Sequence, residues 1–515
     1  MLIIDGNRLN IEDVILVARH GEKVGLAESA LEGMIQSHNW VSAIIESGKP
    51  VYGINTGFGI FSEQRISSKD FEKLSRNLIL SHAVSTGPEL PLEVVKAAML
   101  IRANTLAKGF SGVRPEIVST LIEMLNQGIT PVVPSQGSLG SSGDLASLSN
   151  LALVFTTDAQ DMEAESGWAY FNGSNLKKMS GKAAMNAAGI PRLVLGSKEG
   201  LALINGATFS AAIAALAVFD ATHMLHIAEI SLSMSLEALL GVSAAFDDRI
   251  HQARQHPGQI KVASKIRNLI KGSTLIDSTG RVQDAYSLRC APQVQGAARD
   301  TVEFVKGIIQ REINAATDNP LLFGQDEAIS GGNFHGEPIG MGMDFLSIAM
   351  AEVAAISERR TFRLLDAQLN AGLPPMLVDK PQDAGINSGM MMLQYTAASL
   401  VLENQTLANS DTIHSLPTSA EQEDHNANSM TAARHTRQII DNITHVLAIE
   451  IYCATRALSL RLKKYPQAKM GQGVQLAYEL LCDRVPYIEG DAWWAPEIET
   501  VHEMVTKGIF DTITA

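Results

Sequence analysis

Residues 201–219 read LALINGATFSAAIAALAVF and contain no charged side chain. The stretch approaches the ~20 residues that span a bilayer. However, Asn205, Thr208 and Ser210 are polar, and the many alanines lower its hydrophobicity. Residues 384–402 form a second uncharged stretch of the same kind. We therefore predict that both are helices buried on all sides at the centre of a large soluble bundle, and that neither crosses a membrane.

Helical periodicity extends outward from these stretches along most of the chain. Apolar residues recur at intervals of three and four in residues 91–106, 114–125, 299–315, 341–365 and 432–460. Alternating runs, which are typical of strands, are few and short, and residues 2–4 are the best of them. The predicted fold is therefore mainly α, with a long central helical bundle.

The length of 515 residues predicts two or three domains, or one unusually large helical body. Polar turn residues alternate with short helical pieces in residues 166–200, and we place a boundary there. The prediction is a smaller N-terminal domain, residues 1–195, followed by a long-helix domain with the C-terminal helices, residues 196–515.

Charge and cysteine content limit the partners and the compartment. The net charge of -14 argues against nucleic acid and anionic membranes, both of which select basic surfaces. The three cysteines, Cys290, Cys453 and Cys482, cannot form a disulfide framework. The first residues lack the basic and apolar regions of a signal peptide. We therefore expect a cytoplasmic protein.

The segment most informative about chemistry is GSLGSSGDLA, residues 137–146. It resembles a flexible turn before a helix capped by Asp144. A phosphate loop is a weak alternative because the Gly-Lys-Ser/Thr ending is missing, and the glycines are wrongly spaced for a nucleophile elbow.

A third interpretation of this segment involves its own backbone. In a tightly bent Ser-Ser-Gly, the amide nitrogen of Gly143 can approach the carbonyl carbon of Ser141, since glycine has no Cβ in the way. Loss of water from the ring, and of the Ser142 hydroxyl as a second water, leaves an exocyclic methylene. The product is an electrophile made from the main chain.

The segment resembles the cofactor loop of the aromatic amino acid ammonia-lyases, which make a methylidene-imidazolone (MIO) group from Ala-Ser-Gly. Six further segments match this family in chain order: VYGINTGFG (51–59), NLILSHA (77–83), EGLALING (199–206), QDAYSLRC (283–290), SGGNFHGEP (330–338) and SAEQEDH (419–425). The similarity runs from about Tyr52 to about Leu460. It implies a bundle like that of fumarase and aspartase, with the cofactor loop in the smaller N-terminal domain.

The resemblance also implies roles for residues near the electrophile. Tyr52 would remove the β-proton of the substrate, whereas the motif taken alone is more typical of a packed tyrosine. A phenol titrates near ~10, so a base role requires a lowered pKa from nearby positive potential. Asn205 would lie beside the electrophile, and Phe334, otherwise a typical core residue, would pack against the MIO ring.

Gln283, Tyr286 and Arg289 are spaced at i, i+3 and i+6. If they are helical they line one face, which is either an ordinary polar face or a binding surface. The planar guanidinium of Arg289 suits the α-carboxylate of an amino acid. The family implies that Tyr286 acts in catalysis, and that Gln283 and Arg289 bind the substrate.

Two groups of residues have types that bind metals, but their spacing argues against metal. His223, His226 and Glu229 would share one face of a helix, yet the HExxH spacing is absent. The adjacent residues 423–425 would diverge if they were helical. Cys290 is predicted to be a structural thiol. We therefore predict no metal and no external cofactor.

Within the family, Ser81-His82 and the segment QEDH, residues 422–425, resemble the histidine enzymes. An imidazole substrate needs a hydrogen-bonding partner and a carboxylate, which His82 and Glu423 would provide. Ser141 replaces the usual alanine, and we expect cyclisation to survive because the reacting carbonyl is unchanged. Glu421, which we also assign to substrate binding, and the longer segment 426–430 resemble the phenylalanine and tyrosine lyases.

The leading hypothesis is elimination of ammonia from L-histidine to give urocanate, with MIO formed from Ser141-Ser142-Gly143. The first alternative is a phenylalanine or tyrosine ammonia-lyase, or an MIO-dependent aminomutase. A less favoured one is a catalytically dead helical scaffold whose Ser-Ser-Gly never cyclises. The resemblance also implies a homotetramer whose active sites are each built from several subunits.

Overall fold

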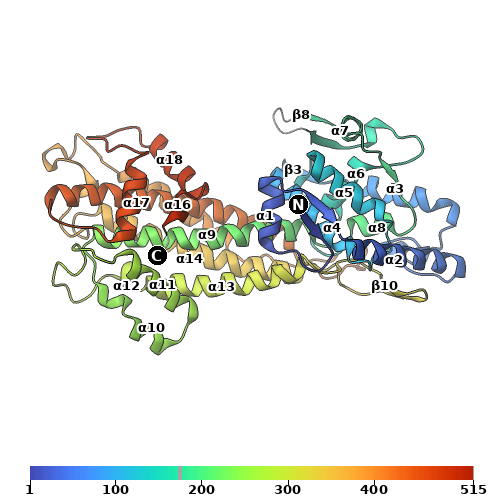
Figure 1. Cartoon of the computed structure of the whole chain (residues 1–515), viewed down its shortest axis with the longest axis horizontal. Coiled ribbons are helices and arrows are strands. Elements are labelled where there is room, and N and C mark those ends of the chain that lie inside the picture. Colours follow the sequence, from blue (N-terminus) through green and yellow to red (C-terminus); the bar gives the residue numbers. More distant parts are fainter. Residues whose placement is uncertain (172–176, 514–515) are drawn as a thin grey trace. The chain divides into compact units, whose positions relative to one another are not determined.

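The computed structural model describes residues 1–171 and 177–513, which form two compact units described here separately (Figure 1). The first unit comprises Met1–Phe219, Lys306–Asp344 and Ser410–Arg434. The second comprises Asp220–Val305, Phe345–Asn409 and His435–Ala515. Neither unit is continuous in sequence, and the single division after residue 195 stays a prediction.

The first unit combines short helices with small two- and three-stranded sheets. Its helices are α1 (Ile11–His20), α2 (Glu28–Ser47), α3 (Phe71–His82), α4 (Leu92–Ala107), α5 (Pro115–Gln127), α6 (Leu145–Phe155), α7 (Gly181–Ala188) and α8 (Glu199–Ile204). Its strands are β1 (Leu2–Ile4), β2 (Val24–Leu26), β3 (Thr86–Glu89), β4 (Ile129–Pro131), β5 (Pro134–Gln136), β6 (Thr156–Thr157), β7 (Trp168–Phe171), β8 (Lys177–Ser180), β9 (Leu193–Val194), β10 (Leu321–Gly324) and β11 (Glu327–Ile329). The pairs β1–β2 and β6–β9 are parallel, whereas β3–β5, β10–β11 and the sheet β4–β7–β8 are antiparallel.

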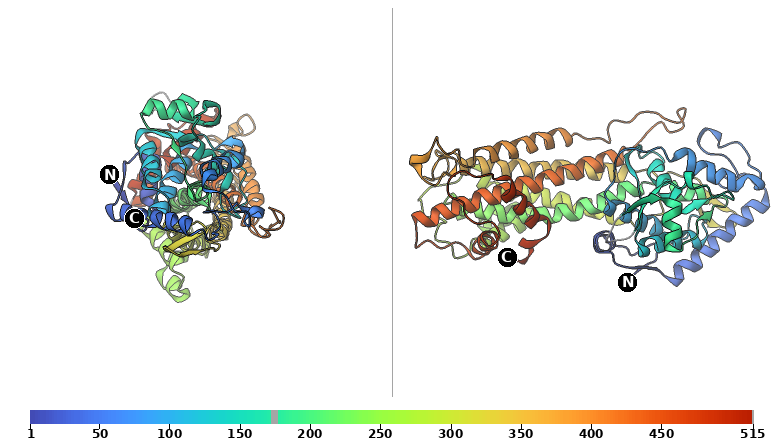
Figure 2. Two further views of the ribbon diagram at one scale, coloured as in Figure 1. Left: turned by 90° about the vertical axis from the view of Figure 1, so that its right-hand side faces the viewer. Right: turned by 90° about the horizontal axis from the view of Figure 1, so that it is seen from above.

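Four long helices have residues in both units: α9 (Thr208–Ala238), α13 (Ala291–Glu312), α14 (Glu337–Leu365) and α16 (Ser429–Lys464). The remaining helices belong to the second unit: α10 (Asp248–Arg254), α11 (Pro257–Leu269), α12 (Tyr286–Arg289), α15 (Met391–Leu407), α17 (Gln472–Cys482) and α18 (Ala495–Thr506). Within that unit the long helices lie lengthwise along one another (Figure 2). The predicted mainly α fold with a long helical bundle is confirmed.

Local sequence signals explain where the predicted helices begin and end. Helix α5 begins with Pro115, and the N–H that proline lacks would have no partner within the first turn of a helix. Gly128 ends the helix in a left-handed conformation. The periodic segments identified in the sequence correspond to α4, α5, α13, α14 and α16, and residues 2–4 form β1. These predictions are confirmed.

A buried carboxylate ties the long helices of the second unit together. Glu450 of α16 is fully buried and accepts hydrogen bonds from Ser231 and Ser235 of α9, at 3.0 and 2.7 Å. It also accepts one from Ser357 of α14 at 2.6 Å and is paired with the buried Arg360. Because a buried charge is costly unless it is paired and hydrogen bonded, this network specifies how the three helices pack.

By length and composition alone, α9, α14 and α16 are apolar enough to cross a membrane. In α16, 89% of the most apolar window is buried inside the protein, which explains the hydrophobicity as core packing. The prediction for residues 201–219 is largely confirmed, although the helix is interrupted between Ile204 and Thr208. For residues 384–402 it is wrong, because α15 begins only at Met391 and exposes one apolar face.

The buried Glu237 near the end of α9 makes stability depend on pH. Its carboxylate accepts a hydrogen bond from the Gly471 N–H at 2.8 Å. Burial raises the pKa of Glu237 from 4.5 to about 8, although the hydrogen bonds from Gly471 and Ser273 favour the charged form. The folded state therefore holds this proton more tightly than the unfolded chain does.

We expect wild-type stability to fall as pH rises from 4.5 to 8, by roughly 1.4 kcal/mol per pH unit from this group. Glu237→Gln should remove that contribution, so the stability of the variant relative to the wild type should increase as pH rises. Urea unfolding at pH 6 and pH 9 measures the difference. The exposed Glu32→Gln is the matched control and should show no such gain. An equal pH dependence of wild type and Glu237→Gln would contradict the assignment.

Candidate active site

The Ser-Ser-Gly loop is held by backbone contacts to the turn between α8 and α9. The Gly206 N–H donates to the Ser142 carbonyl at 3.0 Å, and the Asp144 N–H donates to the Gly206 carbonyl at 3.0 Å. Gly143 has φ of +86°, and a Cβ built on it would lie 2.0 Å from the carbonyl carbon of Gly206. Only glycine fits at position 143. The loop therefore has at position 143 the residue that the proposed backbone cyclisation needs.

Asp144 follows the loop and is completely buried. Its carboxylate accepts hydrogen bonds from the Ser138 hydroxyl at 2.7 Å and from the backbone N–H and hydroxyl of Ser210, at 2.8 and 2.9 Å. Burial raises the pKa of Asp144, although these hydrogen bonds act in the opposite direction. The expected side-chain cap of α6 is wrong, because the carboxylate instead binds the first turn of α9 and so fixes the loop against that helix.

Asn205 lies in a buried network of charged groups. Its side-chain amide donates to Asp318 at 3.2 Å, and Asp318 is paired with Lys198 at 2.6 Å, both fully buried. Although burial disfavours the charged form, Lys198 lowers the pKa of Asp318. The amide orientation of Asn205 is therefore fixed by a carboxylate that cannot easily be protonated.

A buried arginine holds the end of α8 in place. Arg102 donates to the carbonyl oxygens of Ala202, at 3.2 Å, and of Asn205, and to the Thr317 hydroxyl at 3.1 Å. Burial lowers its pKa to about 10, while Asp318 and Asp144 act to raise it. Because the last carbonyls of a helix have no partners within the helix, this arginine satisfies groups that would otherwise be unpaired.

A cavity of about 1360 Å³ lies in the first unit next to the Ser-Ser-Gly loop. Seven of the residues predicted for the site line it: Tyr52, His82, Ser141, Ser142, Asn205, Phe334 and Glu423. These residues come from segments as far apart as positions 52 and 423. The fold thus places candidate residues from the N-terminal half of the chain around the same cavity as Phe334 and Glu423.

Tyr52 lies in a loop, with its ring edge-on to Phe58 at 6.5 Å between ring centroids. Burial raises its pKa, the charges of Glu423 and Asp318 raise it further, and a hydrogen bond from the Gly59 N–H acts in the opposite direction. The lowered pKa expected of a base is therefore not produced by the surroundings of Tyr52 in the single chain.

Glu423 faces the cofactor loop directly. The Ser142 hydroxyl donates to Glu423 Oε1 at 3.1 Å. A two-hydrogen-bond bridge between the backbones of Thr418 and Glu423 holds the carboxylate at this position, with N–O distances of 2.8 and 3.2 Å. The carboxylate is therefore placed between the reacting serine and the space where a substrate would bind.

His82, at the end of α3, has one ring nitrogen occupied. Its Nδ1 donates to the carbonyl oxygen of Leu78 at a distance of 2.9 Å, because a carbonyl oxygen can only accept a hydrogen bond. In the neutral ring the lone pair is therefore on Nε2. Burial lowers the pKa of His82, while the Leu78 hydrogen bond and the charge of Glu423 raise it. The neutral ring offers an acceptor to a donor such as an imidazole N–H.

Five predicted site residues are not among those that line this cavity in the part of the chain that the structure describes, and one of them, Gly143, lies within the loop itself. Gln283, Tyr286 and Arg289 belong to the second unit. The expected shared helical face is wrong for Gln283, because α12 begins at Tyr286. The Tyr286 side chain is 70% exposed, and the Arg289 guanidinium lies 4.6 Å from the centroid of its ring. Glu421 is exposed, in a left-handed turn with φ of 67°.

The metal-binding alternatives considered in the sequence have other partners. His226 Nδ1 lies 2.7 Å from Lys265 Nζ, Glu229 is paired with Arg299, and His223 donates to a backbone carbonyl at 2.9 Å. Residues 423–425 lie outside any helix.

Sequence reasoning missed the three charged residues that support the site: Arg102, Lys198 and Asp318. Each is nine-tenths buried or more, which is rare for its residue type. The one available signal was the position of Lys198, which directly precedes the matched segment 199–206. No motif, however, indicated that Lys198 pairs with Asp318.

The arrangement suits a family whose model, aromatic amino acid lyase, matches residues 9–482. The chain belongs to the aromatic amino acid lyase family. This confirms the resemblance drawn from the motifs and implies the MIO chemistry of the family. It also makes the protein a carbon–nitrogen lyase.

Three relatives show how far the similarity extends. A histidine ammonia-lyase of Caldanaerobacter subterraneus subsp. tengcongensis is 48% identical over 99% of this chain and 98% of that protein. The crystal structure of histidine ammonia-lyase from Trypanosoma cruzi is 34% identical, with a TM-score of 0.89, over 99% of this chain and 94% of that chain. The crystal structure of a tyrosine aminomutase from Streptomyces globisporus is 32% identical, with a TM-score of 0.91, over 99% of this chain and 98% of that chain.

Proposed function

We infer that this protein eliminates ammonia from L-histidine to give urocanate. The observation that carries the inference is one cavity in which Ser142 is hydrogen bonded to Glu423 and in which His82 presents a ring acceptor. The family and its histidine ammonia-lyase members support the same reaction. We also propose that the enzyme is cytoplasmic, since its three free cysteines suit a reducing compartment.

We propose that Ser141, Ser142 and Gly143 cyclise with loss of two waters to form MIO, which supplies an electrophile for the substrate amine. Gly143 is the residue that permits the ring, because any Cβ there would collide with Gly206. Asp144 and Gly206 hold the two ends of the loop and limit the conformations it must search. Asn205 and Phe334 line the same cavity, where Asn205 would lie beside the electrophile and Phe334 would pack against the MIO ring.

His82 and Glu423 are proposed to select the imidazole. As an imidazolium, the substrate ring would donate one N–H to His82 Nε2 and the other N–H to the Glu423 carboxylate. The Ser142 hydroxyl that occupies Glu423 Oε1 is lost on cyclisation, which leaves this oxygen for the substrate. A phenyl ring would leave both groups unpaired, at a cost of roughly 1–3 kcal/mol each.

Tyr52 is proposed to take the β-proton of the substrate. Because burial and two carboxylates raise its pKa in the single chain, a phenolate requires additional positive charge. We propose that Arg289 of a second copy supplies this charge while it binds the substrate carboxylate, and that Tyr286 and Gln283 accompany it. Tyr286 on α12 and Gln283 in the loop before it are both exposed, which supports this arrangement.

A homotetramer is proposed as the form in which these sites are completed. Large apolar side chains are exposed on α13, α14 and α15: Phe304, Phe345, Ile348, Met392, Tyr395 and Leu402. Exposed apolar surface of this kind is typical of a protein–protein interface. Light scattering after size exclusion measures the assembly, and a fully active monomer would contradict the proposal.

The runner-up is a phenylalanine or tyrosine lyase or an aminomutase, which Glu421 and the longer segment 426–430 favour. The test is incubation of the purified protein with histidine, phenylalanine and tyrosine, followed by ultraviolet absorbance of the unsaturated acids and chromatography for β-amino acids. Urocanate from histidine supports the inference, whereas product from the other substrates alone overturns it. Intact mass distinguishes the enzyme from a catalytically dead scaffold, since only a cyclised chain is lighter by two waters.

We expect His82→Leu to lower kcat/KM for histidine by roughly 5–160-fold, the equivalent of 1–3 kcal/mol for one buried partner. The apolar leucine cannot accept the imidazole N–H. Turnover of phenylalanine, however low, should not fall, and it serves as the internal control. Parallel losses on both substrates would instead indicate a general disturbance of the cavity.

A further inference from the structure

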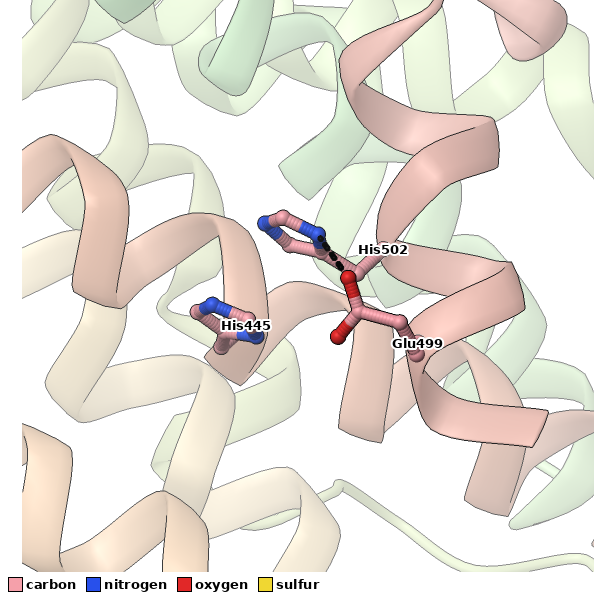
Figure 3. Close-up of side chains that lie close together, drawn as sticks. All are labelled: His445, Glu499 and His502. Atoms are coloured by element: carbon pink, nitrogen blue, oxygen red, sulfur yellow. Dashed lines mark ion pairs between the residues drawn. The ribbon is translucent and has the colours of Figure 1, made fainter. Parts of the chain in front are cut away.

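Two histidines and a glutamate of the second unit lie together in a cluster that the proposed reaction does not use. His445 projects from α16, and Glu499 and His502 project from adjacent turns of α18 (Figure 3). A ligand atom from each of the three lies within 4.8 Å of the others. None of the three lines the cavity beside Ser142.

The imidazoles of this cluster are poorly satisfied by protein partners. The two rings are stacked, with centroids 3.9 Å apart and planes 3° from parallel. His502 Nδ1 is buried and lies 3.5 Å from Glu499 Oε1, which is too long for a well-formed hydrogen bond. Within residues 1–171 and 177–513, no hydrogen bond to the His445 ring is found. A buried polar atom without a hydrogen-bond partner, here His502 Nδ1, calls for an explanation.

The exposures of the side chains differ, with His502 20% and Glu499 61% exposed. Glu499 is the most exposed of the three and keeps the cluster open to an ion arriving from solvent.

We propose that His445, Glu499 and His502 bind a divalent transition-metal ion, with Zn²⁺ the best match to the donor set. Two imidazole nitrogens and one carboxylate oxygen are ligands that Zn²⁺ uses, and water completes a tetrahedron. The ion links α16 to α18 and thereby stabilises the packing of α18.

Binding requires a small rearrangement of the cluster. Imidazole binds a metal in its own ring plane, so two parallel rings cannot both aim a lone pair at one ion. Metal–nitrogen bonds of about 2.0–2.1 Å in a tetrahedron place the two nitrogens about 3.3 Å apart. One ring must therefore turn out of the stack. The two rings come from different helices, so each can turn about its own side-chain bonds.

The test uses the full-length chain freed of metal by a chelator and then dialysed. Zn²⁺ binding is measured by calorimetry and by the rise in thermal midpoint, and Co²⁺ serves as a spectroscopic probe because its visible absorption reports tetrahedral nitrogen ligands. We expect one tight ion per chain in the wild type. His445→Gln and His502→Gln should each abolish the tight ion and the thermal shift, and Glu499→Gln should weaken binding at least about tenfold.

His256→Gln is the matched control, because His256 is exposed in the same unit and lies outside the cluster. It should bind Zn²⁺ as the wild type does. Deamination is measured for the metal-free wild type and for metal-free His445→Gln. Equal activity of the two shows that the variant is folded. Absence of a tight ion in the wild type, or its persistence in both histidine variants, overturns the proposal. Loss of binding in His256→Gln would place the ion elsewhere and overturn it equally.

Discussion

Ser142→Ala is expected to abolish deamination, by on the order of 10³-fold or more, the scale of losing a covalent catalytic group. The Ser142 hydroxyl is the group whose loss as water creates the methylene, and no neighbouring side chain can supply it. The Ser142 carbonyl would still accept from the Gly206 N–H, so the loop should keep its shape. The intact mass should therefore lack the loss of two waters, while the circular dichroism should match the wild type.

Ser141→Ala is the matched control, since it changes the adjacent serine in the same way. The Ser141 carbonyl is the reacting group, and its hydroxyl takes no part in the proposed cyclisation. Ser141→Ala should therefore lose both waters and retain activity. Equal activity of Ser142→Ala and the wild type would remove the basis of the proposed chemistry. Inactivity of both variants would instead give the Ser141 hydroxyl a role.

The helices were predictable from sequence because each needs an apolar stripe that repeats with the helical period. Helix α4 was located to within one residue at each end, since Pro91 and the apolar pattern both mark it. Residues 384–402 were misjudged because absence of charge does not distinguish a buried helix from an exposed apolar face. The interruption at residues 205–207 was missed because its side chains are small and uncharged.

The site was predictable as far as local motifs reach. The loop containing Ser142 and the segment containing Glu423 were found separately, and the structure brings them to 3.1 Å. The pair of Lys198 and Asp318 could not be found, because its members are 120 residues apart and each resembles an ordinary surface charge. The helical spacing of Gln283 failed since it needed seven helical residues, whereas α12 spans only Tyr286–Arg289.

Tyr52→Phe is expected to lower kcat for histidine by about 10²–10⁴-fold, the usual contribution of a general base. Only the phenol oxygen is removed, so the ring should keep its edge-on contact with Phe58 and KM should change little. The cofactor loop is untouched, and the intact mass should still show the loss of two waters. This separates Tyr52→Phe from Ser142→Ala, which is inactive because it never matures. Tyr170→Phe, at a tyrosine that does not line the cavity, is the matched control and should behave as the wild type does.

The pH profile provides a readout that a merely structural tyrosine would not change. Burial and the charges of Glu423 and Asp318 raise the pKa of Tyr52 in the single chain, and Arg289 of a second copy is proposed to act against them in the assembled enzyme. Because only the phenolate accepts a proton, wild-type kcat/KM should rise with pH in proportion to the phenolate fraction. Tyr52→Phe should lose this rise along with its rate. A variant that keeps the wild-type slope, or loses less than tenfold in kcat, would assign the β-proton to a different base.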